Sequence, residues 1–479
     1  MDQTSTPLFN ALLKHKQAGT VSFHVPGHKN GTIFPQKGEG LFQNLLSIDA
    51  TELSGLDDLH EPEGPILEAQ ALLSDLYSSK ESLFLVNGTT VGNLAMIMAV
   101  SNPGDTVLVQ RNCHKSILHG QMLAGLSPVF VHPEIDPEWQ IAGGLSAQNV
   151  EKALAEYPQT KAVILTHPNY YGMSRDLAEI VQAAHKREIP VLVDEAHGAH
   201  FAAGHPFPLS ALEAGADVVV HSAHKTLPAM TMGSYLHLNR SSLVSSERIK
   251  FYLQMLQSSS PSYPIMASLD LARAYLAAYS KSDKASLERR VKCFKEGLAR
   301  INGLHVMEPT VPSDIDLLKI TIRADGISGF ALQQKLEQNS IYTELADTKN
   351  VLFVLPLLKK EQSYPFDKAL SSIERILQDS ITSPETEVSP WITDVKTVSR
   401  LGLTYSEMRQ RPKKMVHLND SIGKISAETI TPYPPGVPLI MAGERISSDM
   451  VLYLRELVDK GSRFHGGKAI HRFLVEVYK

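Results

Sequence analysis

The sequence predicts an α/β protein with a large domain built on a mainly parallel, seven-stranded sheet, a smaller α+β domain and a C-terminal α+β domain. Between about residues 65 and 239, short apolar segments typical of buried strands alternate with segments whose apolar residues recur at helical spacing. This alternation is typical of βαβ units, in which the strands run parallel. A chain of 479 residues is also too long for one compact core, so two or three domains are expected.

Seven strands and the helices between them can be placed in this part of the chain. Strands are expected at residues 83–86, 106–109, 129–132, 162–166, 191–194, 217–221 and 233–238, and helices at residues 65–78, 89–100, 114–124, 147–157 and 177–186. Ligands of such sheets bind beyond the carboxyl ends of the strands. This rule directs attention to Gly88 and to residues 111–114, 194–197 and 222–225.

The rest of the chain is predicted to form the smaller domains. Helices are expected at residues 246–257, 267–280 and about 283–302, and a smaller α+β unit at residues 317–323, 331–339 and 351–355. Polar residues 383–389 are interpreted as a linker, and the Pro-rich residues 431–438 are too rigid for a helix interior. The expected parts are an N-terminal arm (1–64), a large domain (65–282), a small domain (283–383) and a C-terminal domain (390–479).

The composition disfavours several classes of protein. The net charge is −5, and the 46 Lys and Arg residues form no basic block that would follow a nucleic-acid backbone. The two cysteines, Cys113 and Cys293, provide neither a disulfide framework nor a cysteine-based zinc site. Residues 1–7 do not resemble a secretory signal, and the apolar stretches are shorter than the ~20 residues of a membrane helix. A cytoplasmic protein with no nucleic-acid or membrane partner is expected.

The segment Asp194-Glu-Ala-His197 allows three interpretations. The DEAH box of a helicase would need an upstream phosphate loop of the form G-x-x-x-x-G-K-[ST], which the sequence lacks. A metal site formed by Asp194, Glu195, His197 and His200 would need further ligands at a recognised spacing, so no metal is predicted. The third interpretation, a site for pyridoxal phosphate (PLP), accounts for more positions at once.

PLP needs a lysine for its Schiff base, a carboxylate at its pyridine nitrogen, a group that stacks on its ring and donors for its phosphate. Asp194 ends an apolar strand, where a carboxylate can reach a buried ring nitrogen. Lys225 comes just after the next strand, with Ser222 and His224 beside it as phosphate donors. Gly88-Thr-Thr90 opens a helix whose hydroxyls and first backbone N–H groups suit a phosphate.

A second lysine, Lys115, must also be considered, because it too follows a histidine. Lys115 begins a predicted helix and lies far upstream of the acidic strand, so Lys225 is predicted to carry the cofactor and His114 to stack on its ring. Three alternatives stay open at this point: His114 as an ordinary N-terminal helix residue, Asp194 as a helix N-cap or loop residue, and Lys225 as a solvated loop lysine.

Motifs follow one another along most of the chain. They are Phe23-His-Val-Pro-Gly-His-Lys29, Gly55-Leu-Asp-Asp-Leu59, Asn87-Gly-Thr-Thr90, Arg111-Asn-Cys-His-Lys-Ser116, Val193-Asp-Glu-Ala-His-Gly198, Ser222-Ala-His-Lys225, Ser258-Ser-Ser-Pro-Ser-Tyr263, Met266-Ala-Ser-Leu-Asp270, Pro432-Tyr-Pro-Pro-Gly-Val-Pro438 and Ala442-Gly-Glu444. In this order the sequence resembles the bacterial Orn/Lys/Arg decarboxylases, PLP enzymes of fold type I, the aspartate-aminotransferase fold. Several motifs at family spacing are a far more specific signal than any one alone.

The resemblance implies α-decarboxylation of a basic amino acid with PLP as the cofactor. By position, Lys225 carries PLP, Asp194 pairs with the pyridine nitrogen and His114 stacks on the ring. Lys225 or His114 then returns a proton to the substrate Cα. Further cofactor-binding positions implied by the resemblance are His197, Thr89, Thr90, Ser222, His224, Ser258 and Ser259. The loop of Ser258 and Ser259 resembles one lent by a neighbouring subunit, which implies a homodimer or a dimer-based homo-oligomer.

Two departures from the family pattern affect these expectations. The sequence begins directly with a linking arm, without the wing domain of the large acid-induced members, so their decamers are not expected. Thr90, Ser258 and Ser259 replace the more usual Ser and Thr but keep a hydroxyl.

The sequence does not choose between arginine, lysine and ornithine as the substrate. Arginine, giving agmatine, is favoured because short chains of this type resemble biosynthetic polyamine enzymes. Asp57, Asp58, Glu63 and Glu444 are the candidate partners for the distal cation of the substrate. Alternatives are another fold-type-I enzyme (an aldolase, or an aminotransferase with Arg323 as its carboxylate clamp), a PLP-binding regulator and an inactive paralogue.

Overall fold

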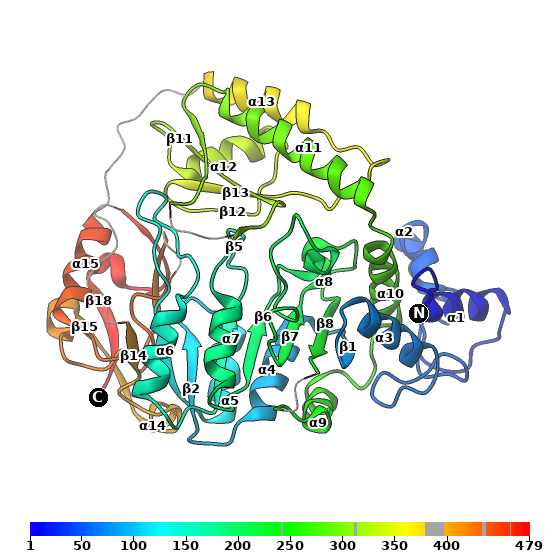
Figure 1. Ribbon diagram of the computed structural model, residues 1–479, viewed down its shortest axis with the longest axis horizontal. Helices are drawn as coiled ribbons and strands as arrows, with labels where there is room; N and C mark the ends of the chain where they lie inside the picture. Colours follow the sequence, from blue (N-terminus) through cyan, green and yellow to red (C-terminus); the bar gives the residue numbers. More distant parts are fainter. Residues whose placement is uncertain (241–242, 311–313, 379–396, 434–436, 460) are drawn as a thin grey trace. The chain divides into compact units, whose positions relative to one another are not determined.

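The computed structural model of the protein describes residues 1–240, 243–310, 314–378, 397–433, 437–459 and 461–479 (Figure 1). The chain divides into two compact units: Met1–Val100 with Pro190–Ser280, and Ser101–Ile189 with Lys281–Lys479. The expected linker at residues 383–389 and part of the Pro-rich segment, residues 434–436, lie outside the described residues.

The first unit contains four almost fully buried strands. In spatial order they are β1 (Glu81–Leu85), β8 (Ser234–Leu238), β7 (Val218–His221) and β6 (Val191–Asp194). β6 and β7 are parallel, whereas β8 is antiparallel to both β7 and β1. β1, β6 and β7 therefore point the same way, and their carboxyl ends lie at one edge of the sheet.

Helix α4 (Gly88–Val100) packs against all four of these strands. It approaches closely because Gly92 has no side chain: a Cβ there would lie 2.7 Å from Leu85 Cδ1 and 2.8 Å from Val220 Cγ1. Gly88 has a φ of +74°, a conformation that favours glycine, and it lets the chain turn directly from β1 into α4.

The other helices of this unit are α1 (Pro7–Gln17), α2 (Gln36–Leu46), α3 (Pro65–Leu76), α9 (Ser246–Leu256) and α10 (Tyr263–Ala277). α10 begins four residues earlier than the predicted start at residue 267. Its N-cap is Ser262, whose hydroxyl accepts a hydrogen bond from the Ile265 N–H, and Pro264 lies in its first turn. α1 is held by α10, because the Asp270 carboxylate accepts from the Leu8 N–H at 3.1 Å.

The second unit contains the strands β4 (Ala162–Thr166), β2 (Thr106–Gln110), β3 (Ser127–Val131) and β14 (Val398–Arg400), in that order. β2 is parallel to β3 and β4, and the helices that follow these strands are α5 (Lys115–Ala124), α6 (Ala147–Glu156) and α7 (Leu177–His185). β14 was not predicted. It is antiparallel to β3, so the C-terminal region contributes an edge strand to this sheet.

The same unit holds two further layers. Strands β12 (Leu345–Ala346), β13 (Asn350–Val354), β11 (Lys319–Ala324) and β9 (Leu304–Val306) form an antiparallel sheet, accompanied by α11 (Lys281–Ala299), α12 (Gly329–Gln338) and α13 (Phe366–Gln378). α11 and α13 lie side by side (Figure 1).

The C-terminal part contains α14 (Tyr405–Gln410), α15 (Ser448–Asp459), the pair β15 (Lys413–His417) and β18 (Leu474–Tyr478), and the pair β16 (Ile430–Tyr433) and β17 (Arg463–Gly466). Its core includes Ile440, Leu454 and Val475.

The structure confirms the expected α/β fold with a large, mostly parallel sheet and a C-terminal domain. All seven predicted strands form, four in the first unit and three in the second. Within the described ranges, no helix is both long and apolar enough to cross a membrane.

Candidate active site

The first unit brings most of the predicted site residues to one edge of its sheet. Gly88 lies just after β1, Asp194 ends β6 with residues 195–197 after it, and residues 222–225 follow β7. Because these three strands point the same way, the loops after them are neighbours. This is the arrangement expected for a ligand site of an α/β sheet.

The Asp194 side chain is almost fully buried, at 3% exposure, and two donors hold it. The Asn93 amide of α4 donates to Oδ2 at 2.8 Å, and the Ala196 N–H donates to Oδ1 at 3.2 Å. Asn93 was missed in the sequence, although a fully buried amide in an apolar helix, one turn after Thr89, is an unusual feature that could have indicated it.

Lys225 lies in the single-turn helix α8 (Ala223–Thr226), directly after β7. Its Nζ is 3.1 Å from Nε2 of His197, so the structure brings these two predicted residues together. Lys225 is half-buried and His197 is buried. The alternative of Lys225 as a solvated loop lysine does not fit this environment.

The predicted phosphate donors meet where α4 and α8 begin. The hydroxyls of Thr89 and Ser222 are 2.9 Å apart, and Ser222 is buried. Nδ1 of His224 is 3.0 Å from the Gly233 carbonyl oxygen, which fixes the orientation of that ring. Thr90 is exposed in the first turn of α4. The hydroxyls and the N-terminus of a 13-residue helix are a donor set suited to a phosphate.

Ser258 and Ser259 are exposed residues just after α9. The Ser258 N–H donates to Oδ1 of Asn87 at 3.3 Å, and the Ser258 carbonyl oxygen is 3.0 Å from Nε2 of His60. The loop is therefore attached to the residue that precedes α4.

His114 belongs to the second unit, where it is the N-cap of α5, the helix that follows β2. Its Nδ1 accepts from the Ser116 N–H at 3.3 Å and is 2.8 Å from the Ser116 hydroxyl. Lys115 is exposed in the first turn of α5. The exposed Lys115 is a poorer candidate for a buried cofactor linkage than the half-buried Lys225.

Glu195 and His200, two of the residues weighed as metal ligands, are fully buried in the first unit. The Oε2 atom of Glu195 lies 2.6 Å from Nε2 of His221. In the part of the chain that the structure describes, no group of three or more His, Cys, Asp or Glu side chains is arranged to hold a metal ion.

Two of the four acidic candidates for the distal cation are already engaged. The Asp57 carboxylate accepts N–H groups from the turn into α3, including Glu63 and Gly64 at 2.8 Å, and these hydrogen bonds outweigh burial and lower its pKa. Glu444 is buried and forms a two-pronged ion pair with Arg111, at 2.5 Å and 2.7 Å. Asp58, whose Oδ1 accepts from the His60 N–H at 2.8 Å, and Glu63 remain as candidates.

The Arg111 guanidinium connects the end of β2 to the C-terminal part of the same unit. Besides Glu444, it donates to the Pro438 carbonyl at 2.8 Å, to the Leu439 carbonyl at 3.1 Å and to the Ser399 hydroxyl at 2.7 Å. Arg111 is 1% exposed, so these partners must compensate for the water that its charged group loses on burial.

The structure predicts a loss of stability in mild acid, because three imidazoles, two fully buried and one half-buried, remain neutral in the folded protein. Burial lowers the pKa of His221 to about 3 and that of His237 well below its usual value. Burial, and secondly the charge of Arg111, lowers the pKa of His132 to about 3. In the unfolded chain a histidine takes up a proton near pH 6.5, so stability present above that pH is lost as the pH falls.

Each of the three histidines is expected to lower the free energy of unfolding by about 1.4 kcal/mol for every pH unit below about 6.5. Denaturant unfolding at about pH 7.5 and pH 5.5 measures the effect, and His132→Gln should remove about a third of it. A free energy of unfolding that is constant or rises over this interval would contradict the assignment of neutral histidines.

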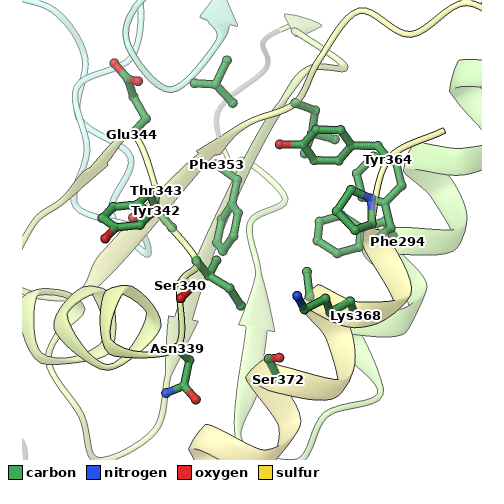
Figure 2. A pocket seen from close by; sticks show the side chains of 16 residues that line it. Phe294, Asn339, Ser340, Tyr342, Thr343, Glu344, Phe353, Tyr364, Lys368 and Ser372 are labelled. Carbon is green, nitrogen blue, oxygen red and sulfur yellow. The ribbon is translucent and has the colours of Figure 1, made fainter. Parts of the chain in front are cut away.

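Two of the larger pockets each lie within one unit. One, of about 340 Å³, lies in the second unit. Figure 2 shows its lining, which includes Phe294 of α11, Phe353 of β13, Lys368 of α13, and Tyr364, which precedes α13. No predicted site residue lines it. A pocket of about 660 Å³ in the first unit lies beside β1 and includes Glu63.

Comparison with known proteins identifies the family. Residues 6–321 match the Orn/Lys/Arg decarboxylase major domain, and residues 393–471 match the Orn/Lys/Arg decarboxylase C-terminal domain. The chain is 48% identical to the uncharacterized protein YaaO of Bacillus subtilis over 477 residues, covering 99% of this chain and 98% of that protein. It is 33% identical to an arginine decarboxylase of the same organism over 490 residues, covering 100% and 99%.

Solved structures show the same fold. Lysine decarboxylase A of Pseudomonas aeruginosa matches with a TM-score of 0.82 at 20% identity, over 99% of this chain and 80% of that one. The constitutive lysine decarboxylase of Escherichia coli gives 0.78 at 22% identity, over 100% and 82%. These likenesses confirm fold type I, and the sequence matches establish that the chain belongs to the Orn/Lys/Arg decarboxylase family.

Proposed function

We propose that this protein is a PLP-dependent α-decarboxylase of a basic amino acid, with arginine as the favoured substrate and agmatine as the product. The proposal rests above all on one observation: Asp194, Lys225, Ser222 and Thr89 lie at one edge of the first unit's sheet, in a chain of this family.

The side chains present fit PLP. Asp194 offers a buried carboxylate for the ring nitrogen, Lys225 an amine beside His197, and Ser222 and Thr89 adjoining hydroxyls for the phosphate. PLP supplies an electron sink for the pair left when carbon dioxide departs. The groups of the chain itself bind and orient the reactants and move protons.

Asp194 has the task of holding a proton on the ring nitrogen. The donors Asn93 and Ala196 hold the carboxylate in position, and a carboxylate at that place would attract the ring proton. Lys225 would hold the cofactor through its Nζ, and the same nitrogen could act as a base or acid when it is free. His197, 3.1 Å away, can exchange a proton with that nitrogen. His114 is proposed to stack on the ring.

The environment of Arg323 disfavours the aminotransferase alternative. Its guanidinium lies 4.5 Å above the Trp139 ring and donates to the Glu138 and Trp139 carbonyls and to Asn350. An arginine engaged in this way is a structural element of the second unit rather than a clamp for a substrate carboxylate.

Arginine is favoured because the arginine decarboxylases of Bacillus subtilis and Halalkalibacterium halodurans are 33% and 35% identical to the chain. Asp58 and Glu63 are the proposed partners for the distal cation. Glu63 is exposed and lines the pocket beside β1. We further propose a homodimer in the cytoplasm, with Ser258 and Ser259 serving the site of the partner subunit.

Incubation of the PLP-loaded protein with arginine, lysine or ornithine tests the function. Release of carbon dioxide with an equal amount of amine is expected, and arginine should give the highest kcat/KM. Transfer of the amino group to a keto acid without carbon dioxide would contradict decarboxylation, whereas preference for lysine or ornithine would contradict only the choice of arginine.

A further inference from the structure

A buried chain of polar side chains crosses the first unit on one face of its sheet. It runs from Ser79 to Ser82 (2.7 Å), to Nδ1 of His237 (2.7 Å), from its Nε2 to Nδ1 of His221 (3.0 Å), and from His221 Nε2 to Oε2 of Glu195 (2.6 Å). All five side chains are at most 7% exposed. Buried polar groups that hydrogen-bond in this way fix a unique arrangement, because each loses its partner if the strands shift.

Strand register explains why these side chains can form a continuous hydrogen-bonded row. Ser82 of β1 is directly opposite His237 of β8, and His237 is opposite Val219 of β7, two residues before His221. Residues two apart on a strand share a face, so the polar side chains line one face across three strands.

Two further contacts hold this face in place. The Tyr77 ring lies 4.4 Å from the His237 ring and 5.2 Å from the His221 ring, and its hydroxyl donates to the Ala199 carbonyl at 2.6 Å. Gly198 makes room for Glu195, because a Cβ at residue 198 would lie 2.5 Å from the Glu195 Cγ. The second Glu195 oxygen accepts from the Ala211 N–H at 2.8 Å.

The opposite face of the sheet carries the proposed cofactor contacts. Asp194 and His221 are the last residues of β6 and β7, and Glu195 and Ser222 come directly after them. Because side chains alternate between the faces along a strand and Glu195 continues the ladder with its N–H on the Val220 carbonyl (3.0 Å), fixing Glu195 and His221 aims Asp194 and Ser222 at α4. There they meet Asn93 and Thr89, which are one helical turn apart.

Building on the proposed PLP chemistry, we propose that Glu195, His221 and His237 are positioning residues that hold Asp194 and Ser222 in place from behind the sheet. They touch neither substrate nor cofactor. Their effect reaches the site through the two strand ends, which supply the contact to the ring nitrogen and a contact to the phosphate.

Binding of PLP to the apoprotein tests this inference without reference to turnover. Glu195→Gln keeps the shape of the side chain but removes its charge. It should raise the Kd for PLP by about 10-fold or more, by analogy with residues that orient metal ligands. It should also shift the pH titration of the bound chromophore, because Asp194 is displaced. Ser79→Ala is the matched control: it breaks the far end of the same chain, so the melting temperature should fall while the Kd stays within about twofold.

If Glu195→Gln does not fold, Ser82→Ala replaces it and should raise the Kd about threefold. The inference is overturned if Glu195→Gln, or Ser82→Ala in its place, folds but leaves both the Kd and the chromophore titration unchanged. It is also overturned if Ser79→Ala raises the Kd as much as Glu195→Gln does. Failure of the unsubstituted apoprotein to bind PLP would instead contradict the proposed function itself.

Discussion

Replacing Asp194 with Asn is expected to leave PLP loosely bound and to reduce kcat by several orders of magnitude. A neutral amide cannot hold the ring nitrogen protonated, and charge stabilisation lost from a transition state typically costs several kcal/mol. The structure adds a second cost. Asn93 and Ala196 both donate to the carboxylate, and an amide has only one oxygen to accept from them. Steady-state kinetics and PLP titration measure both effects.

Asp217→Asn is the matched control for this substitution. Asp217 is also buried, at 1% exposure, and it accepts from the Val191 N–H at 2.8 Å, but it lies just before β7, at the amino ends of the parallel strands. Asp217→Asn should lower the stability of the protein without changing its affinity for PLP. Turnover of Asp194→Asn within about tenfold of the parent, roughly 1.4 kcal/mol of barrier, would show that Asp194 is only structural.

Glu444→Ala is expected to destabilise the protein by about 3–5 kcal/mol, because it leaves the Arg111 charge buried without its ion-pair partner. Denaturant unfolding of the parent and the variant measures the loss. Arg111→Met in the Glu444→Ala background should recover much of it, since the unpaired charge is then absent.

An exposed ion pair in the same C-terminal part provides the control. Lys413 and Glu476 are 3.3 Å apart and 46% and 35% exposed, so Glu476→Ala should cost at most about 1 kcal/mol. If Glu444→Ala costs no more than Glu476→Ala, the Arg111 ion pair contributes little, and Glu444 becomes available again as a candidate for substrate recognition.

The sequence was most informative where reactive side chains lie at or just after the end of a buried strand. Apolar runs located β6 and β7, and the rule for ligand sites in parallel sheets then singled out Asp194 and Lys225. The structure brings Lys225 to His197 and Ser222 to Thr89, as three separate motifs had suggested.

What the sequence left out depends on pairing over long distances. Asn93 contacts Asp194, 101 residues away, so a polar residue in an apolar helix was visible in the sequence but its partner was not. Glu444 looked like a free carboxylate because Arg111 lies 333 residues before it. β14 is only three residues long, and its polar sequence has no periodicity to detect. In each case tertiary contact, not local pattern, determines the role.

Borohydride reduction of the PLP-loaded protein, followed by peptide mapping, tests the central claim most directly. Reduction fixes the cofactor to the lysine that carries it, and the account predicts the label on the peptide that contains Lys225. A label on Lys115, or a protein that takes up no label, would contradict the account.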